Sequence, residues 1–312
     1  MNVRQAAVDL AYAIRAEVSP HLGAPSARRL TGKASSGDEA FAIDDVAERV
    51  IEDFIRENQL PVAYYTEGRG LVEHGRAEHM FVIDPIDGTR PAMRGLEPCV
   101  VSIAVAPNSH NACMSDVSFG CILELKADRL FTAERGGVAR IRENGRELPI
   151  ARTDTQELDK CSWSFEAVGR PFRYIAEVLA PQIDRSGIRG GVYLFSSTAF
   201  SLTRMLTGQF DAVTDVGNRV YRDFPHLRDE FVEAGYGNVI GLFPYDIASA
   251  AMIAETAGCV VTDAYGNSLD PTPLLDTTEP NIQSILAASN PALHEKLLLE
   301  IESGIARLST QV

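Results

Sequence analysis

The sequence predicts an α+β protein in which layers of helices cover mostly antiparallel sheet. Between residues 100 and 141, short apolar segments follow one another, and Gly136-Gly137 and Asn144-Gly145 supply the tight turns that hairpins use. After residue 160, segments with helical apolar spacing alternate with short apolar strands. Elements of this mixture bury their apolar faces by packing as layers.

The expected helices are the segments whose apolar residues recur at helical spacing. Residues 43–58 show this most clearly, because Ile43, Ala47, Ile51 and Phe54 mark one side. Residues 1–21 also form an amphipathic helix, since charged residues interrupt the apolar ones throughout and exclude a signal peptide. Further helices are expected after residue 171, over 197–206, 224–234 and 247–257, and from 292.

The expected strands are short apolar runs that end at turn-forming residues. One covers 62–66 and ends at Glu67-Gly68; the central one covers 81–83 and ends at Asp84-Pro85. The others cover 100–106, 117–125, 130–133, 138–141, 162–168, 191–195, 210–214, 259–262 and 285–288. Residues 25–37, rich in small and basic residues, are expected to form a mobile loop, and 69–78 a polar one.

Composition limits the classes of function. The 312 residues are 45% hydrophobic and 23% charged, which is enough for a large core. A formal net charge of -14 argues against nucleic acid or an anionic membrane as the main partner. The five cysteines form no CxxC pair, and no apolar run reaches membrane-spanning length. We therefore expect reduced thiols and a cytoplasmic protein.

The most informative stretch is residues 81–89, Phe-Val-Ile-Asp-Pro-Ile-Asp-Gly-Thr. Pro85 restricts the backbone between Asp84 and Asp87, so both carboxylates are held on a stiff turn. Carboxylate oxygens are ligands that Mg2+ prefers, and it keeps waters that a phosphate can displace. Gly88 and Thr89 could open a helix whose free N–H groups bind an anion. The alternative is an acidic turn that only ends the strand.

Three more acidic residues stand at the ends of expected elements. Glu67 follows the strand at 62–66 and precedes a glycine. Asp44 and Asp246 stand at or near helix starts, where an N-cap is the structural alternative to a functional role. For Asp246 taken alone, the N-cap is the favoured interpretation.

Together these segments resemble the inositol monophosphatase family, the Mg2+-dependent, lithium-sensitive phosphatases that include fructose-1,6-bisphosphatases. The resemblance rests on Asp84-Pro-Ile-Asp-Gly-Thr89 with Glu67 before it, and it covers nearly the whole chain. It is extended by Lys33, Asp38, Asp44 and Glu48, by Leu130-Phe-Thr-Ala133 with Asn144-Gly145, by Thr207-Gly-Gln-Phe-Asp-Ala212, by Tyr245-Asp246-Ile-Ala-Ser and by Glu255-Thr-Ala-Gly258. It implies an α-β-α-β-α sandwich of the sugar phosphatase type and a homodimer.

The resemblance also implies roles for individual residues. Glu67, Asp84 and the carbonyl of Ile86 would hold one Mg2+, and Asp84, Asp87 and Asp246 a second. Glu67 would assist a weaker third through water, and Mn2+ could substitute. The implied catalytic set is Asp44 and Thr89, which would orient the attacking water, with Glu67. The implied substrate contacts are Asp87, Gly88, Thr89, Ser197, Thr198, Asp215 and Arg219, with Lys33 as support for the site. No covalent nucleophile is assigned.

Several positions depart from the family's pattern. Pro91 stands where an Asn is usual and removes one donor beside the phosphate. Tyr245 replaces a Trp, Ser196-Ser197 replaces a glycine-containing segment, and Asp215 replaces a longer Glu, which weakens the case for myo-inositol itself. The link 216–244 is longer than usual. It could cap the active site and offer Arg219 or Arg222 to a second anionic group, or it could be a packing insertion.

The sequence therefore predicts a Mg2+-dependent phosphomonoesterase that hydrolyses a small phosphorylated polyol, sugar or related metabolite by direct water attack. One alternative is a bisphosphate phosphatase acting on fructose 1,6-bisphosphate or 3'-phosphoadenosine 5'-phosphate. Another is a catalytically silent relative that binds metal and a phosphometabolite. Residues 1–150 would form an N-terminal α+β half with most metal ligands, and 151–312 a C-terminal α/β half with the last one, packed as one unit.

Overall fold

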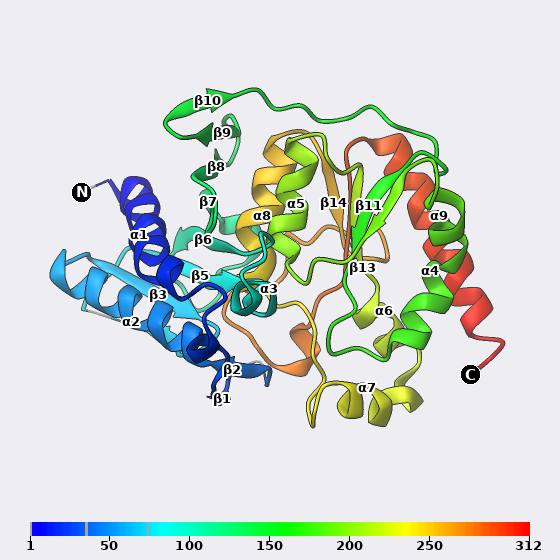
Figure 1. The fold of residues 1–312 in the computed structure, drawn as a ribbon, viewed down its shortest axis with the longest axis horizontal. Helices are drawn as coiled ribbons and strands as arrows, with labels where there is room; N and C mark the ends of the chain where they lie inside the picture. Colours follow the sequence, from blue (N-terminus) through cyan, green and yellow to red (C-terminus); the bar gives the residue numbers. More distant parts are fainter. Residues whose placement is uncertain (1, 35–36, 74) are drawn as a thin grey trace.

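The computed structural model describes residues 2–34, 37–73 and 75–312, and these form alternating layers of helix and sheet (Figure 1). The first layer is the helix pair α1 (Val3–Val18) and α2 (Ala42–Glu57). A large sheet follows, then α5 (Thr198–Leu206) with α8 (Pro244–Thr256), then a smaller sheet. The helices α4 (Phe172–Ser186) and α9 (Pro291–Leu308) cover its far face. The α-β-α-β-α sandwich is confirmed.

In the described part of the chain, the large sheet has eight strands in the order β10-β9-β8-β7-β6-β5-β3-β4. All neighbours are antiparallel except β3 and β5, which are parallel. The strands are β3 (Val62–Thr66), β4 (Gly70–Val72), β5 (His79–Asp87), β6 (Val100–Pro107), β7 (Phe119–Glu124), β8 (Arg129–Glu134), β9 (Arg140–Glu143) and β10 (Arg146–Leu148).

The smaller sheet, over the same described residues, has the order β12-β11-β13-β15-β14. Its first three strands run parallel, and β15 is antiparallel to both of its neighbours. The strands are β11 (Ser162–Phe165), β12 (Gly191–Tyr193), β13 (Ala212–Asp215), β14 (Val260–Thr262) and β15 (Ile285–Ala288). The carboxyl ends of β11 and β13 meet at one edge, which brings Glu166 after β11 near Asp215 at the end of β13.

Two hydrophobic cores among the described residues hold the layers together. One joins α1 and α2 to the large sheet through residues such as Leu10, Ile51 and Phe81. The other joins both sheets with the helices between and beyond them, and includes Trp163, Met205 and Ile253. The second core draws residues from both halves of the chain, and the proposed boundary at residue 150 stays a prediction. All five cysteines are free thiols, and Cys113 alone among them is not buried.

The structure differs from the sequence-based expectation in several loops. Residues 25–37 were expected to be mobile, yet β1 (Leu30–Lys33) pairs with β2 (Glu39–Phe41) there; residues 35–36 lie outside the described ranges. The loop expected at 69–78 contains β4. The helix expected at 224–234 is shorter, because Pro225 starts a separate turn before α7 (Arg228–Ala234), and α6 (Gly217–Asp223) precedes both. Each helix of the described ranges is too short or too polar to cross a membrane.

Candidate active site

The predicted acidic turn lies where β5 departs from regular pairing with β6. Asp84 faces Ser102 and Asp87 faces Val100, so β5 contains one extra residue between them. Pro85 cannot donate to the ladder, which suits such a bulge. The backbone N–H of Ile86 donates to Asp84 Oδ1 at 3.0 Å and fixes the turn. Both carboxylates are therefore aimed from a rigid strand end, and both are buried.

Asp87 is held by the start of α5. Ser197 Oγ donates to Asp87 Oδ2 at 2.7 Å, and the backbone N–H of Ala199 donates to the same oxygen at 2.6 Å. The backbone N–H of Phe200 points to the same oxygen at 3.4 Å, so the start of helix α5 orients this carboxylate. Of the expected substrate contacts, Ser197 is thus engaged with Asp87, and Thr198 is buried beside it.

Asp44 and Asp246 occupy equivalent positions in two different helices. Each is the third residue of its helix, α2 and α8, and follows a phenylalanine at the N-cap. The N–H of Phe41 donates to Asp44 Oδ2 at 2.8 Å, and that of Phe243 donates to Asp246 Oδ2 at 2.6 Å. Each carboxylate therefore satisfies a helix terminus with one oxygen. Neither residue is the N-cap that was considered as the alternative, because each carboxylate instead caps the helix from its third position. Both residues also line the cavity described next.

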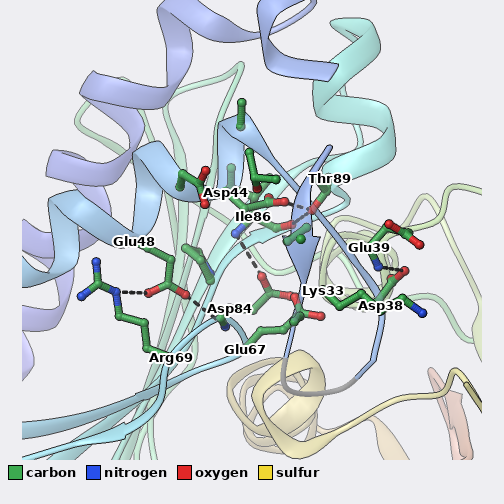
Figure 2. A pocket seen from close by; sticks show the side chains of 18 of the residues that line it. Lys33, Asp38, Glu39, Asp44, Glu48, Glu67, Arg69, Asp84, Ile86 and Thr89 are labelled. Atoms are coloured by element: carbon green, nitrogen blue, oxygen red, sulfur yellow. Dashed lines mark hydrogen bonds and ion pairs between the residues drawn. The ribbon is translucent and has the colours of Figure 1, made fainter. Parts of the chain in front are cut away.

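The acidic side chains line a cavity of connected chambers. The largest, of about 560 Å3, contains Lys33, Asp44, Glu48, Glu67 and Asp84 in its wall. Figure 2 shows Glu67 and Asp84 side by side beneath Ile86, with Asp44 next to Thr89. A second chamber of about 100 Å3 is lined by Glu67, Asp84, Ile86, Asp87, Gly88, Thr89, Tyr245 and Asp246, among others. The residues expected to hold metal thus share one chamber although they come from three separate places in the chain: the end of β3, β5 and α8.

The electrostatics of these carboxyl groups are dominated by burial and mutual repulsion. Burial raises the pKa of Asp84 well above its usual range, and the charges of Asp87, Asp246 and Glu67 raise it further. The pKa of Asp246 is raised by burial and then by Glu67. Burial raises the pKa of Asp87 to about 6, against the hydrogen bonds from α5 that lower it. Such a group of buried oxygen ligands with excess negative charge suits a hard divalent cation.

Thr89 connects this group to Asp44. Thr89 Oγ1 lies 3.2 Å from Asp44 Oδ1 and 3.1 Å from the carbonyl oxygen of Ile86. Burial raises the pKa of Asp44 to about 7. Gly88 precedes Thr89 with φ of 93°, and a Cβ there would stand 2.3 Å from the carbonyl oxygen of Pro98. Only glycine fits that approach, so the position of Thr89 depends on it.

Two expected substrate contacts are committed to ion pairs. Asp215 is fully buried, and its Oδ2 accepts from Arg170. Arg219 binds Glu302 Oε1 at 2.6 Å and the carbonyl oxygen of Ala264, apart from the residues that line the chambers. We therefore leave Arg219 out of the proposed site. Lys33 lines the largest chamber, where its Nζ donates to the carbonyl oxygen of Tyr236 at 3.0 Å.

The long link 216–244 packs on the protein through its helices and borders the site only at its end. Its helices pack on the protein: Arg222 donates to the carbonyl oxygen of Pro280 at 2.6 Å, and Phe231 is buried. Its last part borders the site, because Ile240 and Gly241 line the second chamber. The basic residues of the link are thus structural, and its end forms a wall.

Sequence reasoning missed three residues of the site. Arg90 pairs with Asp38 beside the second chamber. Glu166 and Arg170 line a third chamber of about 90 Å3, together with Asp87, Ser197, Thr198 and Asp246. Burial raises the pKa of Glu166 to about 8, and Arg170 opposes that shift. Glu166 follows an apolar strand just as Glu67 does, a signal that could have drawn attention to it.

Comparison with known proteins identifies the relatives of this arrangement. Residues 1–306 match the inositol monophosphatase family. The chain belongs to the inositol monophosphatase family. A relative from Methanothermobacter thermautotrophicus named fructose-1,6-bisphosphatase/inositol-1-monophosphatase is 28% identical over 303 residues, 95% of each chain. Nus factor SuhB of Escherichia coli K12 is 29% identical over 231 residues, 74% of each.

Solved structures share the fold of this family member. The extragenic suppressor protein suhB from Bartonella henselae aligns with a TM-score of 0.73 at 20% identity, over 97% of this chain and 100% of that one. The Thermotoga maritima IMPase aligns with a TM-score of 0.69 at 20% identity, over 98% and 99%. These similarities support the layered architecture of the chain.

Proposed function

We propose that the protein is a Mg2+-dependent phosphomonoesterase that acts on a small phosphorylated polyol, sugar or related metabolite. The observation that carries this proposal is the convergence of Glu67, Asp84, Asp87 and Asp246 on one small chamber, where burial and mutual repulsion raise the pKa values of Asp84 and Asp246. Ionising carboxyl groups that are buried and repel one another is unfavourable, and a bound divalent cation offsets this. Membership in the family supports a phosphatase of this kind.

The donor set fits metal binding in its chemistry. Hydrogen bonds within the protein hold Oδ1 of Asp84, Oδ2 of Asp87 and Oδ2 of Asp246. We assign Glu67, Asp84 and the Ile86 carbonyl to one ion and Asp84, Asp87 and Asp246 to a second. Bound Mg2+, or Mn2+ in its place, would neutralise phosphoryl oxygens and lower the pKa of a coordinated water. Among the described residues, no three His, Cys, Asp or Glu side chains stand close enough together to hold a metal ion as they are placed, so binding would require some of these side chains to move.

The residues of the chain itself position the water and the ester. Thr89 Oγ1 donates to Asp44 Oδ1 or to the Ile86 carbonyl and can accept from a water beside them. Asp44, with a pKa of about 7, is suited to accept that water's proton near neutral pH. The water oxygen attacks phosphorus, and the bond to the leaving oxygen breaks. The proposal includes no phosphoryl-enzyme, and it assigns Gly88 and Thr89, which line the same chamber, to the phosphate.

The proposal is tested by phosphate release from a panel of phosphorylated polyols, sugars and nucleotides. Release should require Mg2+ or Mn2+, stop with a chelator, and be inhibited by Li+. A bisphosphate preferred over every monophosphate would favour the bisphosphatase alternative, which the names of archaeal relatives keep open. No release from any substrate, with metal binding intact, would favour a silent relative. A homodimer and a cytoplasmic location remain part of the proposal, and the former is tested by light scattering.

A further inference from the structure

Glu67 stands on a turn, whereas the aspartates assigned to the metal ions stand on regular elements. Those aspartates belong to β5 and α8, but Glu67 comes one residue after the end of β3. Residues 67–69 form the turn between β3 and β4, whose pairing starts at Thr66 and Gly70. A side chain on a turn is held less precisely than one on a strand or a helix. The position of Glu67 therefore depends on what fixes this turn.

The strand β3 delivers the turn to the acidic chamber. It runs parallel to β5 as far as the pair of Thr66 with Ile83, so the next residues along the two strands are Glu67 and Asp84. Figure 2 shows these two carboxylates beside each other. A shift of the turn would consequently change the distance between two side chains that we assign to the same ion.

Glu48 of α2 holds the turn on both sides of Glu67. Its Oε2 accepts from Thr66 Oγ1 at 3.0 Å, and its Oε1 accepts from the backbone N–H of Gly68 at 3.2 Å. Glu48 is 7% exposed, and a Cβ on Gly68 would stand 2.7 Å from its Oε1, so the carboxylate closes directly onto the backbone of the turn. One buried carboxylate thus connects the residue before Glu67 to the residue after it.

Arg69 completes this arrangement and also provides a matched comparison. Its N–H donates to Thr66 Oγ1 at 3.1 Å, and its Nε lies 3.6 Å from Glu48 Oε2. Its Nη1 pairs at 2.6 Å with Glu52, which stands one turn further along α2 and has 42% of its side chain exposed. Glu52 therefore shares the helix and the arginine of Glu48, but it is not among the residues that line the chambers.

We propose that Glu48 is a positioning residue that holds Glu67 in place for metal binding. This inference rests on the proposed function, which makes Glu67 a ligand. Glu48 acts through its two hydrogen bonds to the turn and not by contact with the ion. Because the backbone on both sides of Glu67 is fixed, the movement that binding requires there is a rotation of the Glu67 side chain alone. Replacing a residue that orients a metal ligand typically lowers metal affinity about 10–100-fold.

The test measures Mn2+ binding to the full chain without substrate, from the electron paramagnetic resonance signal of the free ion. Glu48→Ala removes both acceptors. Glu48→Gln keeps the size: its amide oxygen can accept from the Gly68 N–H, and its NH2 can donate to Thr66 Oγ1, since a hydroxyl oxygen accepts two hydrogen bonds. Glu52→Ala is the matched control, because it removes the same charge from the same helix. Amide hydrogen exchange of the metal-free protein, followed by NMR, reports whether the Gly68 N–H keeps its acceptor.

The dissociation constant of at least one bound Mn2+ should rise about tenfold or more in Glu48→Ala. It should stay within about threefold of the wild-type value in Glu48→Gln, which retains the contacts, and in Glu52→Ala. The Gly68 amide should exchange faster in Glu48→Ala than in the wild type and the other two variants. Rescue by glutamine separates the hydrogen bonds of Glu48 from its charge.

Thr66→Val is the second variant, because it removes one of the two contacts of Glu48 with little change in shape. It should weaken Mn2+ binding in the same direction, and it carries the test if Glu48→Ala does not fold. Mn2+ binding that is unchanged in Glu48→Ala, or in Thr66→Val where that variant replaces it, overturns the inference. So does binding by Glu48→Gln as weak as that by Glu48→Ala, because the charge of Glu48 would then support the ion. A wild type that binds no Mn2+ instead refutes the proposed function.

Discussion

Arg90 and Asp38 form a two-pronged ion pair at the junction of the chambers. Arg90 Nη1 lies 3.1 Å from Asp38 Oδ2, and Nη2 lies 2.7 Å from Asp38 Oδ1. Both residues line all of the chambers described above. Burial lowers the pKa of Arg90, but the pair with Asp38 and then the charges of Glu67 and Asp44 outweigh it, so the pKa is raised overall. The guanidinium group thus supplies positive charge inside a site made mainly of carboxylates, at a position next to the departure at Pro91.

Replacing Arg90 should weaken binding of the anionic substrate. In Arg90→Gln, the charge of Asp38 is no longer balanced by the guanidinium group beside the phosphate, so KM should rise about tenfold, consistent with about 1.4 kcal/mol. Steady-state kinetics at saturating Mg2+ measure this.

The double variant Arg90→Gln/Asp38→Asn is the control, because it removes both charges together. If the rise in KM comes from lost charge balance, the double variant should have a KM close to that of the wild type. A double variant as weak as the single one would show that Arg90 acts by direct contact instead.

Asp84→Asn should abolish turnover while the fold stays intact. The amide removes an anionic ligand at the centre of the chamber, yet it also removes a buried charge that three neighbours repel. The metal-free variant should therefore unfold at a temperature a few degrees above that of the wild type at pH 8. Phosphate release and calorimetry together measure both effects, and full activity would reject the metal assignment. Asp246→Asn should behave in the same way.

Strong local patterns account for the parts of the fold that the sequence predicts well. The strands Val62–Thr66 and Ile285–Ala288 match their predicted limits, because each is a short apolar run bounded by polar residues or turns. The strand at Leu30–Lys33 was missed because all four residues are exposed and carry no apolar alternation.

In the site too, residues placed by local sequence patterns were predicted, and residues placed by contacts between distant segments were not. Asp84, Asp87 and Glu67 stand out because strand ends and a proline place them locally. The pair between Arg170 and Asp215 joins residues 45 positions apart, across the parallel neighbours β11 and β13. Sequence alone shows neither that neighbourhood nor that Arg170 occupies Asp215.

Gly88→Ala should damage both stability and activity. Its φ of 93° costs an L-residue about 1–2 kcal/mol, and the added Cβ would also meet the Pro98 carbonyl at 2.3 Å. Relief of that contact must move Asp87 or Thr89, and displacement of about 1 Å can cost about 10²-fold in rate. Chemical denaturation and kcat measure the two effects. Gly136→Ala is the matched control, because Gly136 also has positive φ but open space around it. It should show the loss of stability from strain without the loss of rate.

The stability of the metal-free protein should depend on pH in the direction opposite to that of ordinary paired carboxylates. Burial raises the pKa of Asp44 to about 7 and that of Asp87 to about 6, above the value of 3.8 for an exposed aspartate. Between those values the native state binds more protons than the unfolded state, so the free energy of unfolding falls as pH rises from about 4 to about 7. Because the proposed Mg2+ ligands are the ionised carboxylates of the native state, added Mg2+ should restore the loss.

Thermal unfolding at pH 5 and pH 8, with a chelator and with Mg2+, measures this coupling. The rise in unfolding temperature on adding Mg2+ should be larger at pH 8, at about 2–4 °C for each kcal/mol of stabilisation. Asp87→Asn removes one of the titrating groups and one ligand, so its pH dependence and its response to Mg2+ should both shrink. A Mg2+ effect that is equal at the two pH values, or unchanged in Asp87→Asn, would mean that the ion binds elsewhere. Protons and metal compete for the same oxygens only if these buried carboxylates are the metal ligands.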